Sequence, residues 1–116
     1  MPRYLLIVET DENNVPDEAL IERMDALVEE MTEAGVITLP GGVGGLKPTA
    51  DATRVRMEGG DLAVTDGPFT ETKEVVGGYV ILQTEDRAGA VEWASRFLKV
   101  HEGWTMTGEI REIRTA

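Results

Sequence analysis

The sequence has 116 residues, the size of one domain, and we expect a single domain over residues 1–116. A net charge of −11, from 22 acidic and 11 basic residues, disfavours nucleic acid and anionic lipid as partners. The chain lacks cysteine, which excludes a disulfide scaffold and an iron–sulfur cluster. It shows neither a signal peptide nor a run of the ~20 apolar residues that a membrane span needs. We therefore expect a cytoplasmic protein.

The first part of the chain predicts a strand, a helix and a second strand. The short apolar run Arg3–Glu9 is typical of a central strand that is buried on both faces. Apolar residues in Leu20–Met31 recur in steps of one, three and four, which predicts an amphipathic helix. We expect Asn14 to cap this helix and Gly35 to end it, with Val36–Pro40 as the next strand.

The glycine-rich segment GGVGGLKP, residues 41–48, predicts a loop. It fits neither glycine fingerprint of a phosphate-binding loop, and no helical pattern follows it. We therefore expect a flexible or tightly turned connection that binds no nucleotide.

Two short runs in the middle of the chain predict a hairpin. Ala52–Glu58 alternates in the manner of a strand, and Leu62–Asp66 returns after the turn Gly59-Gly60-Asp61. Beyond it, Gly77–Glu85 predicts a long strand. Asp86 then caps a helix over about residues 87–99, and the alternating TMTGEIREIR closes the chain as a strand.

The order of these elements predicts an α+β fold. Without the inserted hairpin the order is β-α-β-β-α-β, the ferredoxin-like or split βαβ pattern, in which both helices cover one face of an antiparallel sheet. The segments YLLIV and YVIL carry apolar residues for both faces of the sheet. We therefore expect a second subunit on the bare face, in a symmetric homodimer.

The segment TDGPFTETKEVVGGYVIL, residues 65–82, resembles the signature of the DGPF-type proteins, a branch of the YCII-related family. RYLLIVE, EAGVITLPGGVGGLKPTADATRVR and GEIREIR are similar to the family's other segments, so the resemblance covers nearly the whole chain. It implies a ferredoxin-like fold assembled as a dimeric α/β barrel, with a cleft between sheet and loops.

The same resemblance implies two directions for function. Some YCII-like relatives are enzymes that act on small cyclic or aromatic compounds, with a His–Asp pair proposed as the acid–base centre. Genes of the DGPF branch often lie beside those of extracytoplasmic-function sigma factors. The first half of this chain has no histidine, so the His–Asp pair does not carry over, and Asp66 carries over only as a motif residue.

Two interpretations of residues 65–78 stay open. In the structural one, Asp66 bonds nearby backbone N–H groups, and the following Gly67-Pro68-Phe69 shapes and anchors a turn. In the functional one, a carboxylate beside aromatic side chains acts as a base, and a lysine holds a substrate anion. The candidate catalytic residues are Asp66 and Glu74, and the candidate ligand-binding residues are Phe69, Thr70, Glu71, Lys73 and Tyr79.

The only histidine, His101, lies in the predicted turn HEGW. An imidazole can exchange a proton near neutral pH, but a lone histidine in a turn is typical of an exposed side chain, which is what we expect here. Neither H-x-H nor H-x-x-x-H is present, so we expect no metal site, and no motif points to a cofactor.

The leading functional hypothesis is a cytoplasmic homodimer that binds a small molecule in a cleft beside the DGPF loop. It allows cofactor-free acid–base chemistry of the lyase or isomerase type, with the choice between enzyme and binding protein left open. The alternative is a non-enzymatic regulatory or interaction module linked to sigma-factor or stress regulation. Its acidic helix would then meet a basic partner, and the binding would be sensitive to salt.

Overall fold

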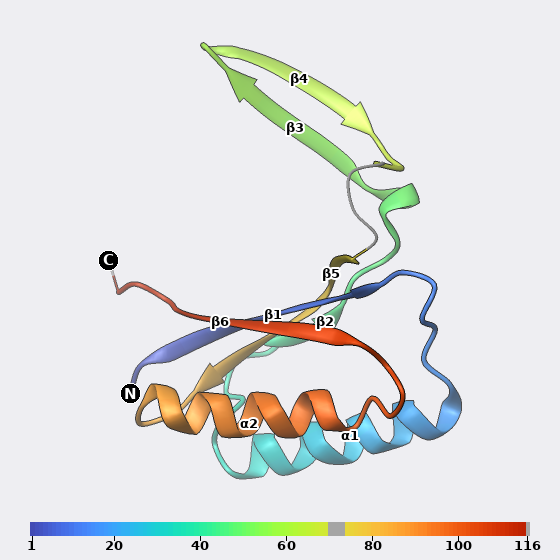
Figure 1. The fold of residues 1–116 in the computed structure, drawn as a ribbon. Coiled ribbons are helices and arrows are strands. Elements are labelled where there is room, and N and C mark those ends of the chain that lie inside the picture. The colour runs from blue at the N-terminus through green and yellow to red at the C-terminus, as the bar shows by residue number, and fades with distance from the viewer. Residues whose placement is uncertain (70–73, 116) are drawn as a thin grey trace.

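The computed structural model describes residues 1–69 and 74–115. Four strands form one antiparallel sheet in the order β2-β5-β1-β6, and β3 and β4 form a separate hairpin. Set apart from the hairpin, the order is β-α-β-β-α-β, so the predicted α+β class and element order are confirmed. The elements are β1 (Arg3–Asp11), α1 (Glu18–Glu33), β2 (Val43–Gly45), a short 3-10 turn (Thr49–Asp51), β3 (Thr53–Glu58), β4 (Asp61–Asp66), β5 (Glu74–Gln83), α2 (Arg87–Lys99) and β6 (Met106–Glu112) (Figure 1).

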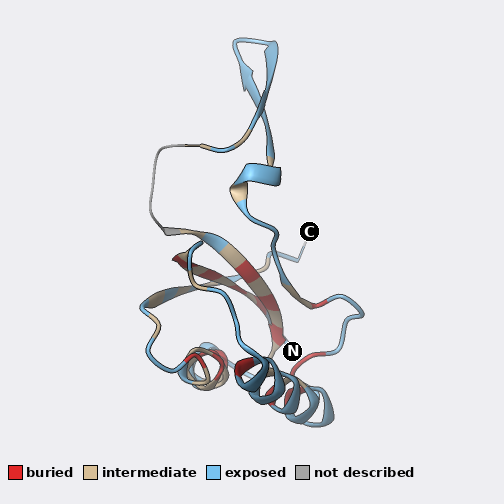
Figure 2. Cartoon of the chain, turned by 90° about the vertical axis from the view of Figure 1, so that its right-hand side faces the viewer, coloured by how far each residue is buried: buried red, intermediate tan, exposed pale blue. Residues whose placement is uncertain are grey.

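Both helices cover the same face of the sheet (Figures 1 and 2). Burial alternates along β1, because Tyr4, Leu6, Val8 and Thr10 are buried toward the helices while the residues between them are only half-buried. The prediction that β1 is buried on both faces is therefore wrong for the single chain. On the second face, which we call the outer face, the half-buried or exposed apolar residues are Leu5, Ile7, Val76, Tyr79 and Ile81.

The helix ends follow the local sequence. Asp17 caps α1, since its side chain accepts a hydrogen bond from the backbone N–H of Leu20 at 2.8 Å. The predicted cap Asn14 lies too far upstream and instead donates to the hydroxyl of Thr10 at 3.3 Å. Gly35, with φ at +77°, follows the end of α1 as predicted, and the Asp86 side chain caps α2.

Two arginines join the helices across their exposed edges. Arg23 of α1 donates from Nε and Nη2 to the carbonyl oxygen of Val100, at 3.3 and 3.1 Å, at the end of α2. Arg96 of α2 donates to Glu30 of α1 at 2.6 Å. This hydrogen bond holds the pKa of Glu30 below its ordinary value of 4.5.

The second strand lies later in the chain than predicted. Val36–Pro40 is not a strand; Val36 and Ile37 are buried in the core, and the Val36 carbonyl accepts a hydrogen bond from the N–H of Gln83. The strand β2 forms instead in the glycine-rich segment that was expected to be a loop. A Cβ on Gly44 would lie 3.0 Å from the Tyr79 ring on β5, so glycine lets the ring pack closely on β2.

The β3–β4 hairpin stands away from this body, on the side of the sheet opposite the helices (Figures 1 and 2). Every residue of its two strands is exposed. Gly59 and Gly60, with φ at 57° and 89°, form its two-residue turn, so Asp61 begins β4 rather than lying in the turn. The hairpin prediction is confirmed.

Candidate functional site

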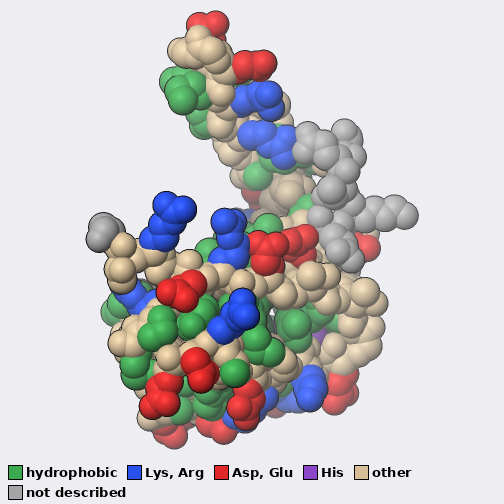
Figure 3. Space-filling model, turned by 60° about the vertical axis from the view of Figure 1, so that its left-hand side comes forward, with side chains coloured by type: hydrophobic (Ala, Val, Ile, Leu, Met, Phe, Trp, Pro, Cys, Tyr) green, Lys and Arg blue, Asp and Glu red, His purple; other side chains and the backbone are tan. Residues whose placement is uncertain are grey.

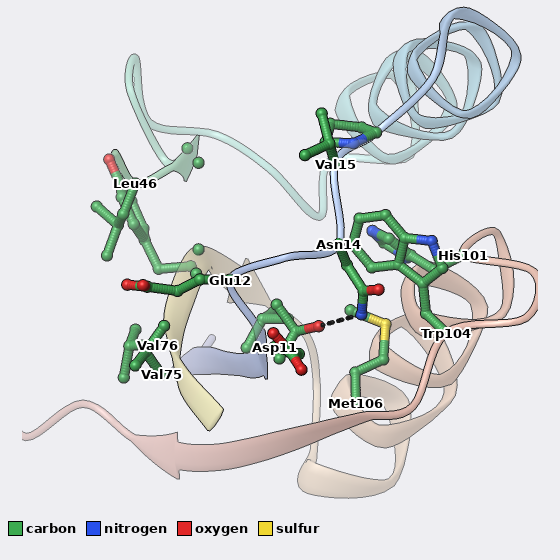
Figure 4. A pocket seen from close by; sticks show the side chains of 18 of the residues that line it. Asp11, Glu12, Asn14, Val15, Leu46, Val75, Val76, His101, Trp104 and Met106 are labelled. Atoms are coloured by element: carbon green, nitrogen blue, oxygen red, sulfur yellow. Dashed lines mark hydrogen bonds between the residues drawn. The ribbon is translucent and has the colours of Figure 1, made fainter. Parts of the chain in front are cut away.

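A cavity of about 420 Å³ opens where β1 ends and β5 begins (Figure 4). Its walls come from the sheet, from the start of the α1 region and from the turn after α2. The wall is mainly apolar, formed by Val8, Val15, Pro16, Met24, Val43, Leu46, Pro48, Val75, Val76, Phe97, Trp104 and Met106. The polar or charged lining residues are Thr10, Asp11, Glu12, Asn14, Lys47, Tyr79 and His101.

His101 is the chemically most versatile residue of this lining. Only 8% of it is exposed, so the expectation of an exposed side chain is wrong. Its ring packs against Phe97 and Trp104, with ring centroids 5.6 and 5.2 Å apart. The turn after α2 holds it there, because the backbone N–H of His101 donates to the carbonyl of Leu98 and that of Trp104 donates to the carbonyl of His101.

The hydrogen bonds of His101 fix its neutral tautomer. Nδ1 lies 3.0 Å from the carbonyl oxygen of Phe97 and 3.3 Å from that of Leu98. A carbonyl oxygen only accepts, so Nδ1 carries the proton and Nε2 carries the lone pair in the neutral ring. Nε2 has no hydrogen-bond partner among the described residues, and it is not completely enclosed, since no fully buried side-chain nitrogen or oxygen in that part of the chain lacks a partner.

The carboxylates on the opposite side of the cavity are held by backbone donors. Glu12 accepts a hydrogen bond from the N–H of Thr49 at 2.7 Å, and Asp11 accepts one from the N–H of Asn13 at 2.8 Å. Figure 4 shows Asp11 between the His101–Trp104 side of the cavity and the side formed by Leu46 and Val76, and it shows Glu12 on the latter side. Two carboxylates against the single ammonium of Lys47 disfavour an anionic ligand at this end.

The DGPF residues organise the foot of the hairpin. Asp66 accepts a hydrogen bond from the Thr53 hydroxyl at 2.9 Å, across the last pair of the hairpin. The Gly67 N–H donates to the Ala52 carbonyl, and a Cβ on Gly67 would lie 1.9 Å from the carbonyl oxygen of Thr49. The peptide bond between Gly67 and Pro68 is cis. None of these residues lines the cavity.

The other candidates from the sequence are divided between three places. The guanidinium carbon of Arg54 lies over the Phe69 ring, 3.9 Å from the ring centre. Tyr79 lines the cavity, and its hydroxyl donates to the carbonyl of Gly41 at 2.9 Å. Glu74 begins β5 opposite Asp11, so its backbone lies beside the cavity. The calls on Thr70, Glu71 and Lys73 lie outside the described residues.

The sequence contained an overlooked signal for the cavity. Phe97, His101 and Trp104 are spaced by four and three residues, the interval at which side chains share one side of a helical stretch. This spacing continues the apolar side of α2 into the turn. This spacing was overlooked because HEGW was interpreted as an ordinary turn.

No group of three His, Asp or Glu side chains in residues 1–69 and 74–115 could hold a metal ion. In the same part of the chain no helix is long and apolar enough to cross a membrane.

Comparison with known proteins gives a family and one relative. The family model of the YCII-related domain matches residues 2–114. An uncharacterized protein of Rhizobium meliloti (strain 1021) is 33% identical over 78 residues, which cover 67% of this chain and 60% of that relative. The aligned part therefore spans less than two thirds of the relative's own length.

Proposed function

The chain belongs to the YCII-related family, and we propose that it binds a small, largely apolar molecule in the cavity beside His101. The single observation that carries this proposal is that Nε2 of His101 has no hydrogen-bond partner among the described residues, in a mainly apolar lining. Such a cavity buries the apolar body of a ligand, and one fixed polar group orients it.

The tautomer of His101 selects the chemistry of the ligand. With Nδ1–H donated to Phe97, Nε2 accepts a hydrogen bond or a proton. A phenol, an enol or another weakly acidic hydroxyl supplies the matching donor. The carboxylates of Asp11 and Glu12 repel a carboxylate ligand, so we expect phenols to be favoured over benzoates of the same shape.

His101 is also the residue best placed for acid–base chemistry. His101 lines the cavity and no described residue bonds its Nε2, whereas Asp66 lies at the foot of the hairpin and outside that lining. We therefore propose His101 as the base of a cofactor-free lyase- or isomerase-like step. The catalytic role of Glu74 beside the cavity stays a prediction, as do ligand contacts by Thr70, Glu71 and Lys73.

Two finer assignments accompany this function. We place the chain in the DGPF branch of its family, because it carries the motif Asp66-Gly67-Pro68-Phe69. We also propose a homodimer in which the outer faces of two sheets meet as a dimeric α/β barrel. The apolar side chains of Leu5, Ile7 and Ile81 on that face support a partner there.

A titration with matched probes tests the cavity. Trp104 lines it, so in a Trp93→Phe background its fluorescence reports binding. We expect 4-methylphenol to bind about fivefold more tightly than 4-methylanisole, the effect of one hydrogen bond of about 1 kcal/mol. We expect 4-methylbenzoate to bind most weakly.

A matched pair of variants locates the site. His101→Asn keeps an N–H donor near the Phe97 carbonyl but removes Nε2, so we expect it to abolish the preference for the phenol. Asp66→Asn, outside the cavity, should leave all three affinities unchanged. Equal binding of the three probes to the parent protein, or an unchanged preference in His101→Asn, would contradict the proposal.

The regulatory alternative rests on a different observation. The exposed face of α1 carries the acidic residues Glu18, Glu22, Asp25, Glu29 and Glu33. A basic protein surface would complement that face, with binding that weakens as salt rises. The absence of any probe binding at the cavity would favour this second function.

A further inference from the structure

The β3–β4 hairpin carries an apolar face that nothing in the described chain covers. Val55 lies opposite Val64, and Met57 lies opposite Leu62, so the four side chains share one side of the hairpin. Their exposed fractions are 63%, 67%, 74% and 70%, respectively. In Figure 3 hydrophobic side chains are visible on the projecting hairpin.

A hairpin of this kind does not hold its structure well alone. An isolated two-stranded hairpin is marginally stable in water and needs packing on a third element. Yet the hairpin strands pair only with each other, and β3 and β4 pack on no other described element to an extent comparable with the contacts inside the body. The lack of such packing within the described residues points to an element of another molecule.

The surface area of the chain points the same way. A compact monomer of 12.7 kDa exposes roughly 6,200 Å², but this chain exposes 8179 Å². Its radius of gyration is 15.8 Å, against roughly 13 Å for a compact domain of this length. The excess of roughly 1,900 Å² is more than twice the ~800 Å² that each partner contributes to a standard interface.

The position of the hairpin selects a second copy of this chain as the partner. The hairpin rises on the side of the sheet opposite the helices, which is the side of the outer face (Figures 1 and 2). A copy seated on the outer face therefore lies next to the hairpin as well. Each of two symmetric copies then offers the other both uncovered apolar surfaces, which closes the assembly as a dimer.

We propose that the β3–β4 hairpin is a dimerisation arm, which grips the second copy through Val55, Met57, Leu62 and Val64. The inference rests on the homodimer proposed above and adds a second contact to it. The proposal gives a function to the hairpin, which projects from the sheet and helices. Because both copies are acidic, added salt should tighten the dimer rather than loosen it.

The test compares two double variants of one strand by native mass spectrometry and light scattering. Leu62→Lys with Val64→Lys places two charges on the apolar side, and Ala63→Lys with Thr65→Lys places the same charges on the other side. We expect the parent protein and the second variant at twice 12.7 kDa, and the first variant at the monomer mass. Circular dichroism should show unchanged helix content in both.

A milder variant keeps the hairpin folded if the lysines disturb it. Val55→Thr with Val64→Thr retains the shape and strand preference of both residues, and we expect at least a tenfold weaker dimer.

A dimer of unchanged affinity in both apolar-side variants would overturn the proposal that the hairpin is a dimerisation arm. Monomers in both lysine variants would overturn the assignment of its face. A monomeric parent protein would overturn both the arm and the dimer. A dimer that Ile7→Lys on the outer face disrupts, but the apolar-side variants do not, would overturn the arm alone.

Discussion

The strands of the body and of the hairpin both place successive side chains on opposite sides, but they differ in what covers those sides. In β1 every second residue is buried under the helices, whereas in β3 and β4 every residue is exposed. Both regions pair their strands antiparallel, and the hairpin carries its large apolar residues on one side, whereas β1 carries apolar residues on both. The comparison teaches that alternation predicts a strand and its two sides, while burial depends on which other element reaches that side.

The largest contrast should come from truncating a leucine in each region. Leu6 is fully buried, so Leu6→Ala should lower the free energy of unfolding by about 2–5 kcal/mol. Leu62 is 70% exposed, so in dilute, monomeric protein Leu62→Ala should change it by less than about 0.5 kcal/mol. Urea unfolding monitored by circular dichroism measures both values. Equal losses would mean that the hairpin packs on its own body.

A second contrast uses glycines. A Cβ on Gly78 would lie 2.9 Å from the backbone oxygen of Gly44, so Gly78→Ala forces β2 and β5 apart and should lower stability by about 1–3 kcal/mol. Gly60→Ala strains the hairpin turn, where φ is +89°, but leaves the body untouched. We expect only the first variant to lower the melting temperature of the helices.

The caps of the helices give a smaller effect within the body. Asp17→Ala removes the acceptor for the Leu20 N–H and should lower stability by about 1 kcal/mol. Asn14→Ala at the predicted but incorrect cap removes only a 3.3 Å bond to Thr10. Thermal unfolding of the two variants should rank Asp17→Ala as the more damaging, and the reverse order would place the cap at Asn14.

The smallest expected effect depends on pH. Arg96 lowers the pKa of Glu30 in the folded protein, so this pair stabilises the protein above the ordinary glutamate value of 4.5 and stops doing so as the pH falls through the lowered pKa. Glu30→Gln should therefore reduce the melting temperature by about a degree or two at pH 7 and by nothing in acid. The exposed Glu29→Gln serves as control. A difference that grows toward low pH would contradict the assignment.

Local patterns predicted most elements of the fold. Asp86 before α2, Gly35 after α1 and the paired glycines of the hairpin each acted through their nearest neighbours. The second strand was missed because its position depends on β5: Gly44 fits under the Tyr79 ring, a contact between residues far apart in the chain. The apolar Val36 and Ile37 fill the core instead.

The candidate site was less predictable for the same reason. The DGPF motif is conspicuous in the sequence, yet Asp66 and Gly67 shape the foot of the hairpin. His101 was taken for a surface residue because its burial requires the end of β1, the end of α2 and Trp104 to meet. The four-residue spacing between Phe97 and His101 was the one local indication that the His101 side chain lies on the apolar side of α2.

The most direct test of the proposed site is a long-range proton–nitrogen NMR spectrum of His101 during titration with 4-methylphenol. The chain has one histidine, so the two ring nitrogens are assigned without ambiguity. We expect a protonated Nδ1 and an unprotonated Nε2 in the free neutral ring, with the Nε2 shift moving to saturation as phenol binds. A proton on Nε2 in the free protein, or an Nε2 shift that does not respond to the phenol, would contradict the proposed site.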